Sequence, residues 1–581
     1  MDFLFKFVGS IFIHMNGLHL LIVSVVVLVL AYFLYGRFLA RTWGIDPSKK
    51  TPAYEFEDGV EYVPTSPAVA FGYEFASIAG AGPITGPIIG AMFGWLPALL
   101  WLLFGAAFFG AVHDFVALYT SVKNKGKSIG YLIDTYVGKS GKRLFLIFVW
   151  LFSILVAAAF ADIVAGTFAG FNADGDSIPT NASVMTTSGL FIPAALGLGF
   201  LIRKRKASDL ASGIIAIDLL IACIVLGIYY PIFLSKASCL YLIFGYIAIA
   251  AILPVWMMGQ PRNYLNSFLL VAMILAAFVG VAFTKPTMEL PAFVAFNVNG
   301  NYLFPALFIT IACGAISGVH SLVVTGTVSK QISNEKYMLP ISYGSMLTET
   351  LVAILALIAV GSLAYGGVLP KETPPVVFAT AVSGFLFKLG LPLQISFIIV
   401  SLAISSFVLT TLDTVARLGR LSFQELFSFE GKSYGTVNII KRIMNSKLVA
   451  TVFTLGPACL LAVFGYQNIW ALFGAANQLL AALTLIACTL FFRMTGRRIV
   501  MLLVPTIVMF AVTFSSLIMA IRTQAIMISH GNIDTTAPIL QMGIAMLLLI
   551  LGILVAFSCT AKLLQKPEPI LKNSNTTAGR Q

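Results

Sequence analysis

The stretch Gly80-Ala-Gly-Pro-Ile-Thr-Gly-Pro87 lies inside an apolar segment long enough to cross a bilayer. Proline has no amide hydrogen, so Pro83 and Pro87 each deprive the carbonyl four residues earlier of its helical partner. In hydrocarbon an unpaired carbonyl is costly, and irregular backbone persists there only where it lines a cavity or meets a ligand. The sequence therefore predicts a broken membrane helix over residues 70–92, with a binding site at the break.

The composition is that of a polytopic membrane protein. Of 581 residues, 59% are hydrophobic and 10% are charged, and the mean hydropathy is +0.96. Apolar runs predict about 15 transmembrane helices, roughly 13 to 17, each long enough to span ~30 Å of hydrocarbon. We predict an all-α membrane protein with a single transmembrane domain at 1–565, an extra N-terminal helix at 18–40, C-terminal helices at 499–562 and a disordered tail at 566–581.

The basic residues predict the orientation of the chain in the membrane. With the N-terminus outside and the C-terminus cytoplasmic, nearly all of the 36 lysines and arginines fall on the cytoplasmic side, as expected for a multi-pass protein of the inner or plasma membrane. The exceptions are Lys6, Lys236, Lys285, Lys371, Lys388 and Arg522. This orientation explains the net charge of +13, so no nucleic-acid partner is predicted. The cysteines show no paired or metal-binding spacing, so no metal or other cofactor is predicted.

A second interrupted span is predicted over residues 303–328. It contains Ile311-Ala-Cys-Gly-Ala-Ile-Ser-Gly-Val-His320, which shares Ile-Ala, Gly-Ala and Ile-(Thr or Ser)-Gly with the segment at the first break. By the charge count the two segments cross the membrane in opposite senses, which is typical of inverted repeats that hold a substrate near the midplane between discontinuous helices. The alternative is that the glycines serve close helix packing.

The half-helices that follow the two breaks present free amides and a positive dipole end to a solute. No Lys or Arg lies deep in any predicted span, so an anionic substrate is expected to depend on these amides. The buried amide side chains of Asn477 and Gln478 need hydrogen-bond partners, and a neighbouring helix is favoured over the substrate as their source. The predicted substrate-binding residues are Gly80, Gly82, Pro83, Thr85, Gly86, Gly314, Ser317, Gly318, Asn477 and Gln478.

Ionisable residues inside spans usually mark ion or proton pathways. His320, just past the second break, and Glu349, in the next span, are the main candidates for coupling transport to protons; the alternative is that both make structural hydrogen bonds. Glu74 and Asp413 lie within about two turns of a predicted cytoplasmic end, close enough to reach water, so for these two a structural or interfacial role is as open as coupling. The predicted proton-coupling residues are His320, Glu349, Asp114, His113, Asp162, Asp218 and Asp413.

Sodium is the less favoured coupling ion. It takes oxygen ligands, and hydroxyls in the span at 392–414 are the candidates, although such hydroxyls also bond the carbonyl of the preceding turn. The residues are Ser405, Ser406, Thr410 and Thr411.

Several segments together resemble the carbon starvation protein A family, over about residues 30–500. They are Thr51-Pro-Ala-Tyr-Glu-Phe-Glu-Asp-Gly-Val-Glu-Tyr-Val-Pro-Thr65, Phe71-Gly-Tyr-Glu-Phe-Ala-Ser-Ile-Ala-Gly-Ala-Gly-Pro83, Gly110-Ala-Val-His-Asp-Phe115, Cys313-Gly-Ala-Ile-Ser-Gly-Val-His-Ser321, Leu412-Asp-Thr-Val-Ala-Arg417 and Leu472-Phe-Gly-Ala-Ala-Asn-Gln-Leu479. The resemblance implies an uptake system of carbon-starved cells, associated with peptides and, in some members, with pyruvate taken up with protons. It also implies a relationship to the amino acid, polyamine and organocation transporters, with their five-plus-five inverted repeat.

The sequence therefore predicts a secondary active transporter for peptides or a small carboxylate such as pyruvate. Its partners are the lipid bilayer, the solute and a proton or sodium ion; the oligomeric state is left open. The alternative is a membrane sensor of carbon status, but no predicted cytoplasmic loop is long enough for an output domain. Direct coupling to ATP is not predicted, because no G-x-x-x-x-G-K-[ST] motif occurs. Enzyme activity is not predicted, because the sequence shows neither clustered histidine ligands nor a nucleophile with a plausible base.

Overall fold

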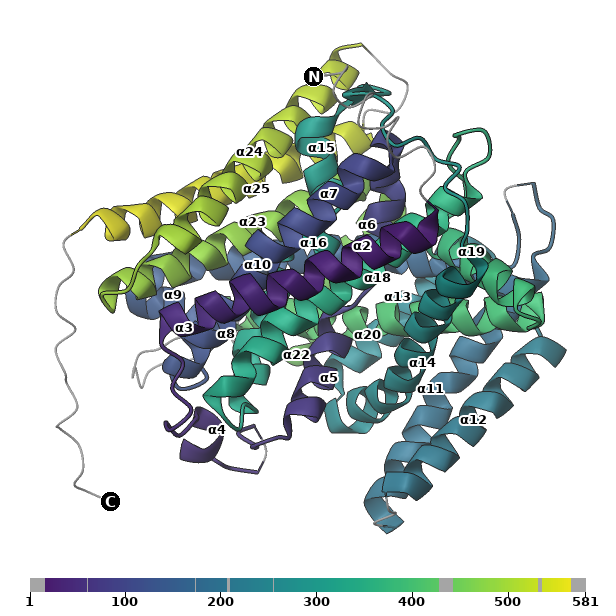
Figure 1. Cartoon of the computed structure of the whole chain (residues 1–581), viewed down its shortest axis with the longest axis horizontal. Helices are drawn as coiled ribbons and strands as arrows, with labels where there is room; N and C mark the ends of the chain where they lie inside the picture. The colour runs from purple at the N-terminus through teal and green to yellow at the C-terminus, as the bar shows by residue number, and fades with distance from the viewer. Residues whose placement is uncertain are drawn as a thin grey trace.

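The computed structural model describes residues 16–59, 61–172, 174–205, 209–253, 255–427, 443–530 and 536–565. The predicted tail at 566–581 lies outside these residues. The described chain is almost entirely helical (Figure 1), apart from a two-stranded antiparallel ladder of β1 (Asn297–Val298) and β2 (Asn301–Tyr302). The fold class predicted from the composition, a helical protein with many apolar helices, is confirmed.

The first half of the chain begins with a helix that contains a π-helical turn and continues through the first break. Its elements are α2 (Gly17–Leu30), η1 (Ala31–Gly36), α3 (Arg37–Trp43), α4 (Pro52–Glu55), α5 (Pro67–Ile78), α6 (Gly82–Gly90), η2 (Ala91–Phe93), α7 (Trp95–Gly105), η3 (Ala106–Gly110), α8 (Ala111–Lys123), α9 (Ile129–Tyr136), α10 (Lys139–Phe168), α11 (Pro179–Arg205), α12 (Asp209–Tyr229), α13 (Lys236–Ile252) and α14 (Val255–Thr284).

The second half begins with short helices and ends with two long ones that lie together along one edge of the molecule, whereas α11 and α12 project from another (Figure 1). Its elements are α15 (Leu303–Thr310), α16 (Ala312–Ala315), α17 (Val319–Gly326), η4 (Val328–Lys330), η5 (Glu335–Tyr337), η6 (Leu339–Tyr343), α18 (Gly344–Leu363), α19 (Pro374–Lys388), α20 (Leu393–Phe427), α22 (Lys447–Ala462), α23 (Tyr466–Met494), α24 (Val500–Ser529) and α25 (Thr536–Leu564).

Eight helical segments of the described chain are long and apolar enough to cross a bilayer, or nine if the bent pair α5–α6 forms one span. The remaining predicted spans do not meet this criterion of length and apolarity within the described residues, so the figure of about 15 crossings stays a prediction. Sequence reasoning missed α19, a largely buried helix of 15 residues, because it is too short to register as a span.

The first interruption falls between Ile78, the last residue of α5, and Gly82, the first of α6, and the two helices are bent by 49°. The break is therefore shorter than the predicted 79–87. Pro83 lies in the first turn of α6, where a helix needs no amide donor, so this proline starts a helix instead of ending one. Pro87 lies inside α6.

In the second predicted interruption, the chain leaves helical geometry at Ile311 and again at Ile316, which is extended with φ −161° and ψ 125°. The four-residue α16 lies between these points and packs against α6. The two interrupted segments therefore touch each other directly.

Glycine makes this contact possible. A methyl group at Gly86 would lie 2.7 Å from the carbonyl oxygen of Thr310, and one at Gly82 would overlap the side chain of Cys313. These glycines serve close packing in this conformation, which was the alternative interpretation of the glycine-rich pattern.

We predict that Gly86→Ala lowers the stability of the purified protein by about 1–3 kcal/mol, because the added methyl group forces α6 away from a backbone oxygen. Gly245→Ala is the matched control, since a methyl group there meets nothing within 4 Å and alanine favours the helix. Thermal unfolding in detergent measures both, and equal midpoints for the two variants would contradict this account.

Candidate functional site

Four ionisable side chains from three helices meet in the interior. Asp114 on α8 faces one histidine with each carboxylate oxygen: Oδ1 lies 2.8 Å from Nδ1 of His113, and Oδ2 lies 2.8 Å from Nδ1 of His320 on α17. Nε2 of His320 lies 3.1 Å from Oε2 of Glu349 on α18. Each of the four is at most 1% exposed. We call these residues the acid–histidine cluster.

Local backbone features bring these helices together. The π-helical turn η3 precedes α8, and its last residue, Gly110, has no room for a side chain because the carbonyl of Ala315 lies against it. Another π-helical turn, η6, precedes α18, and Tyr343 at its end donates a 2.9 Å hydrogen bond to the carbonyl of Ala107 in η3. Since a π-turn leaves backbone carbonyls unpaired, this hydroxyl links the two turns that position Asp114 and Glu349.

The two ring nitrogens of His320 make different contacts. Nδ1 is hydrogen-bonded to Asp114, whereas Nε2 and both carboxyl oxygens of Glu349 have no hydrogen-bond partner among the described residues. The 3.1 Å approach of Glu349 to Nε2 is therefore an electrostatic contact. A charged ring carries an N–H group on each nitrogen and so faces both carboxylates with a donor, whereas a neutral ring has one N–H group only.

Glu74 on α5 adds a further carboxyl group beside the acid–histidine cluster. Its side chain is fully buried, it interacts electrostatically with Asp114 and His320, and neither carboxyl oxygen has a hydrogen-bond partner among the residues that the structure describes. Glu74 therefore does not reach water in this conformation, because α5 packs against α17 and α18.

The other predicted proton-coupling residues lie apart from the cluster. Asp162 accepts a 2.8 Å hydrogen bond from the amide of Tyr466 at the start of α23, and its other oxygen lies 2.8 Å from Nζ of Lys236. Asp218 lies on an exposed face of α12. Asp413 belongs to a second ionic group, described below. The sequence analysis identified all these acids as candidates, but nothing in the sequence shows which of them lie close together in the fold.

The predicted substrate-binding amides on α23 bond to the second interrupted segment. The backbone oxygen of Asn477 accepts from the amide of Gly318 at 3.2 Å, and its side-chain oxygen accepts from the amide of Val319 at 3.2 Å. Gln478 donates to the carbonyl of Phe308 at 2.6 Å. These contacts occupy several backbone groups that the break frees. In addition, Asn477 donates to the hydroxyl of Ser317.

At the first interruption, the structure leaves little space. A cavity of about 10 Å³ lies beside Gly80, Pro83 and Val352, which is room for about one water molecule. Thr85 is fully buried, and its hydroxyl has no partner within the described part of the chain. Around Gly314, a methyl group would press on Ala353 and Leu102. The region around the predicted substrate-binding residues of the first interruption is thus closed in this conformation.

The predicted sodium ligands on α20 do not form an oxygen cage in this conformation. Ser405 and Thr411 each donate to a carbonyl of the preceding turn. Thr410 does the same with the carbonyl of Ser406, and its hydroxyl also accepts from the guanidinium of Arg262 at 3.0 Å. A cationic side chain therefore lies where a sodium ion was considered.

Arg262 is the residue that sequence reasoning missed. The charge count assigned it to a cytoplasmic loop, but Arg262 lies within α14, is 2% exposed, and its Nη2 is 2.6 Å from Oδ2 of Asp413. The preceding Gly259-Gln-Pro261 resembles a turn, but α14 continues through it. The sequence signal for a continuous helix here was that the apolar run interrupted at Pro261 resumes soon after it.

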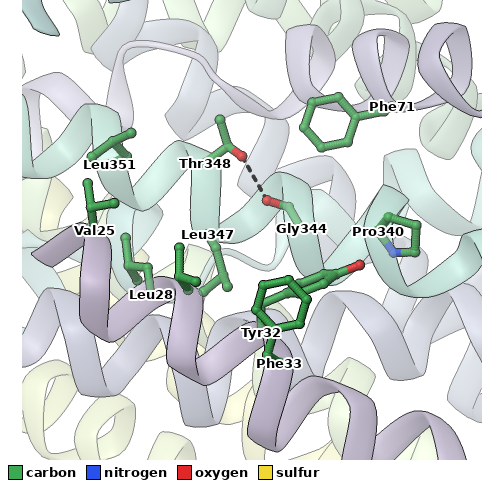
Figure 2. A pocket seen from close by; sticks show the side chains of 11 residues that line it. Val25, Leu28, Tyr32, Phe33, Phe71, Pro340, Gly344, Leu347, Thr348 and Leu351 are labelled. Carbon is green, nitrogen blue, oxygen red and sulfur yellow. Dashed lines mark hydrogen bonds between the residues drawn. The ribbon is translucent and has the colours of Figure 1, made fainter.

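A roomier groove than the cavity at the first interruption lies elsewhere, between α2 and α18 (Figure 2). It has a volume of about 370 Å³, and its lining is mostly apolar, with Val25 and Leu28 of α2 facing Leu347 and Leu351 of α18. Such a lining suits hydrocarbon rather than a carboxylate. The groove therefore does not mark the site of the polar chemistry.

The chain matches the model of the family "Carbon starvation protein CstA" over residues 16–369 and 366–516. It belongs to the CstA family. The peptide transporter CstA of Bacillus subtilis is 33% identical over 536 residues, which cover 81% of this chain and 84% of that protein. The pyruvate/proton symporter BtsT of Escherichia coli is 35% identical over 378 residues, which cover 62% of this chain and 51% of that protein.

A crystal structure of a mutant of the Eremococcus coleocola manganese transporter is similar in fold, with a TM-score of 0.53 at 10% identity, covering 87% of this chain and 99% of that one. The family resemblance predicted from the sequence is thus confirmed. These comparisons support a multi-pass membrane transporter and are consistent with a protein that is not an enzyme.

We predict that Asn477→Ala destabilises the protein by about 1–3 kcal/mol, because it leaves the amide of Val319 without its partner in the interior. Asn468→Ala, which removes an exposed hydrogen bond to the carbonyl of Phe464, is the control and should change stability little. Thermal unfolding followed by size-exclusion chromatography compares them. A larger loss in the control would contradict the assigned role of Asn477.

Proposed function

We propose that this protein is a proton-coupled secondary transporter that takes up a small carboxylate or a peptide, with the acid–histidine cluster as its proton site. The observation that carries this proposal is the position of His320, buried between the carboxylates of Asp114 and Glu349 at 2.8 and 3.1 Å. In the transporter class that the relatives support, buried acid and histidine chains serve as proton relays.

The geometry favours a proton over a metal ion as the coupling species. The two ring nitrogens of His320 point away from each other, and each meets a different carboxylate. They cannot ligate one common ion, whereas each of them can exchange a proton with its carboxylate. The buried Glu74 next to the cluster offers a further acceptor.

The chain connectivity supplies a means of coupling. His320 is the second residue of α17 and directly follows the second interruption, while Glu74 precedes the first interruption on α5. Movement of either half-helix therefore changes the distances within the cluster. The interruptions and their opposed predicted directions support an inverted five-plus-five repeat, in which one bundle rocks against the other.

The names of two relatives indicate which chemical group the solute carries. One relative is named a peptide transporter and another a pyruvate/proton symporter, and peptides and pyruvate both carry a carboxylate. The predicted contacts are the residues at the breaks, above all Gly80, Thr85 and Gly318, once the region has opened. The sensor alternative has no observation in its favour.

We predict that Glu349→Gln abolishes accumulation driven by a pH gradient but preserves solute exchange, because the amide cannot gain or lose a proton. Glu425→Gln, which changes an acid paired with Lys142 and 46% exposed on α20, is the control. Uptake into proteoliposomes with and without a pH gradient gives both values. Full uphill transport by Glu349→Gln would exclude this residue as the coupling group.

We predict that labelled pyruvate or dialanine enters proteoliposomes against its gradient when the interior is alkaline, and that an inward sodium gradient at constant pH has no such effect. The reason is that the cluster exchanges protons, while the α20 hydroxyls are already hydrogen-bonded. Uptake driven by sodium alone would assign coupling to another site and overturn the proposal.

A further inference from the structure

A second group of charges lies between α13, α14 and α20. Nη2 of Arg262 contacts Asp413 at 2.6 Å and the hydroxyl of Thr410 at 3.0 Å. The hydroxyl of Tyr246 on α13 donates to the same carboxylate at 3.1 Å. Asn266, one turn along α14 from Arg262, donates to Thr410 at 2.8 Å. Arg262 and Asp413 are 2% and 4% exposed.

Positive charge exceeds negative charge in this group. Arg417 follows Asp413 by one turn on α20 and donates to the carbonyl of Leu253 at 3.0 Å, and Arg420 follows it and is 8% exposed. Asp413 is the one carboxylate, within the described ranges, whose charge acts on Arg262 and Arg417. The guanidinium groups of Arg262 and Arg417 thus act on a single carboxylate, and the charge of Arg417 also acts on Arg420. We call Arg262, Arg417 and Arg420 the arginine cluster.

Several donors of the arginine cluster are unused. Nε and Nη1 of Arg262, Nη2 of Arg417 and Nε of Arg420 are buried and have no hydrogen-bond partner in the part of the chain that the structure describes. Burying unpaired donors of a cation is costly. An excess of positive charge together with unused N–H groups fits an anion, and guanidinium groups bind carboxylates in a bidentate manner.

The arginine cluster lies along the same helix pair as the first interruption. Leu270 of α14 and Phe407 of α20 line the small cavity beside Gly80. Asn266 precedes Leu270 by four residues and Thr410 follows Phe407 by three, so each is about one turn, roughly 5 Å, farther along its helix. Both steps lead toward the end of the helix that the charge count places in the cytoplasm. A solute that leaves the first interruption between α14 and α20 therefore meets Asn266 and Thr410 and then Arg262.

We propose that Arg262 is an anion site on the cytoplasmic exit route, which receives the carboxylate of the transported solute, and that Asp413 occupies the guanidinium in its place when no solute is present. This inference rests on the proposed transport of a carboxylate. A carboxylate that arrives while Asp413 stays buried adds one negative charge, which the excess positive charge of the arginine cluster offsets. The three unused N–H groups of Arg262 give the solute donors that Asp413 does not take.

The two partners have opposite predicted effects on anion binding. Arg262→Gln removes the receptor, so carboxylate binding weakens by about tenfold or more. Asp413→Asn removes the internal competitor, so binding tightens by a similar factor, about tenfold. If the pair of Arg262 and Asp413 is purely structural, both variants are less stable, and their effects on anion binding do not have opposite signs.

The test uses the full-length protein purified in detergent, with acetate, pyruvate or phosphate added at constant ionic strength. The anion-dependent rise in the thermal unfolding midpoint gives the apparent affinity for wild type, Arg262→Gln and Asp413→Asn. Arg262→Lys keeps the charge and tests the site if Arg262→Gln fails to fold; it should bind carboxylate more weakly than wild type. Lys142→Gln, which removes a cation from the pair with Glu425, is the control and should not change the affinity.

Opposite shifts for the two variants support the anion site. Shifts of the same sign, equal effects of phosphate and carboxylate, or the same loss in Lys142→Gln overturn it. Uptake assays separate this result from the proposed function. If wild type carries neither pyruvate nor dialanine, the proposed function falls while opposite shifts still support the anion site. If wild type transports but neither variant shifts, the anion site falls and the proposed function stands.

Discussion

The structure depends on one constraint, which is that a backbone group freed by a helix break inside a membrane needs a partner. Water is absent from hydrocarbon, so neighbouring helices must supply the missing hydrogen bonds. At the second interruption α23 does this through Asn477 and Gln478, which bond to groups at Gly318, Val319 and Phe308. At the first interruption Pro83 reduces the demand, because it starts α6 without an amide that needs pairing.

Buried charges need partners as well, and the chain places them in two separate groups of side chains, one rich in carboxyl groups and one rich in guanidinium groups. The acid–histidine cluster joins α8, α17 and α18 and is rich in carboxyl groups, with Glu74 beside it. The arginine cluster lies beside α13 and α14 and carries excess positive charge. Keeping the two apart avoids their mutual neutralisation, so one group remains suited to a cation, the proton, and the other to an anion.

The sequence predicted features that depend on local chemistry. The Gly-Pro run from Gly80 to Pro87 marks a place where a helix cannot continue, and the structure has a break there, although it is shorter because Pro83 begins the next helix. His320 and Glu349 were identified as ionisable residues in apolar spans. The resemblance to the CstA family was carried by contiguous motifs and is confirmed by the comparisons.

Features that depend on distant contacts were not predictable from one sequence. Nothing in the chain shows that Asp114 and His320 touch while Asp162 pairs with Lys236, since these are contacts between residues far apart in sequence. Arg262 was assigned to a loop because it falls between two apolar runs, 238–258 and 264–284, yet it lies within α14 and pairs with Asp413 in the interior. Tertiary pairing thus overrode the local signal.

The contact of the two interrupted segments at Gly86 and Thr310 has a mechanical consequence. The glycine leaves no gap between α6 and the start of α16, and pulling two such surfaces apart inside a membrane would open a void that neither lipid nor water fills well. In the proposed transport cycle, α6 and α16 are therefore expected to tilt together, and the space for the solute is expected to open between this pair and the surrounding helices.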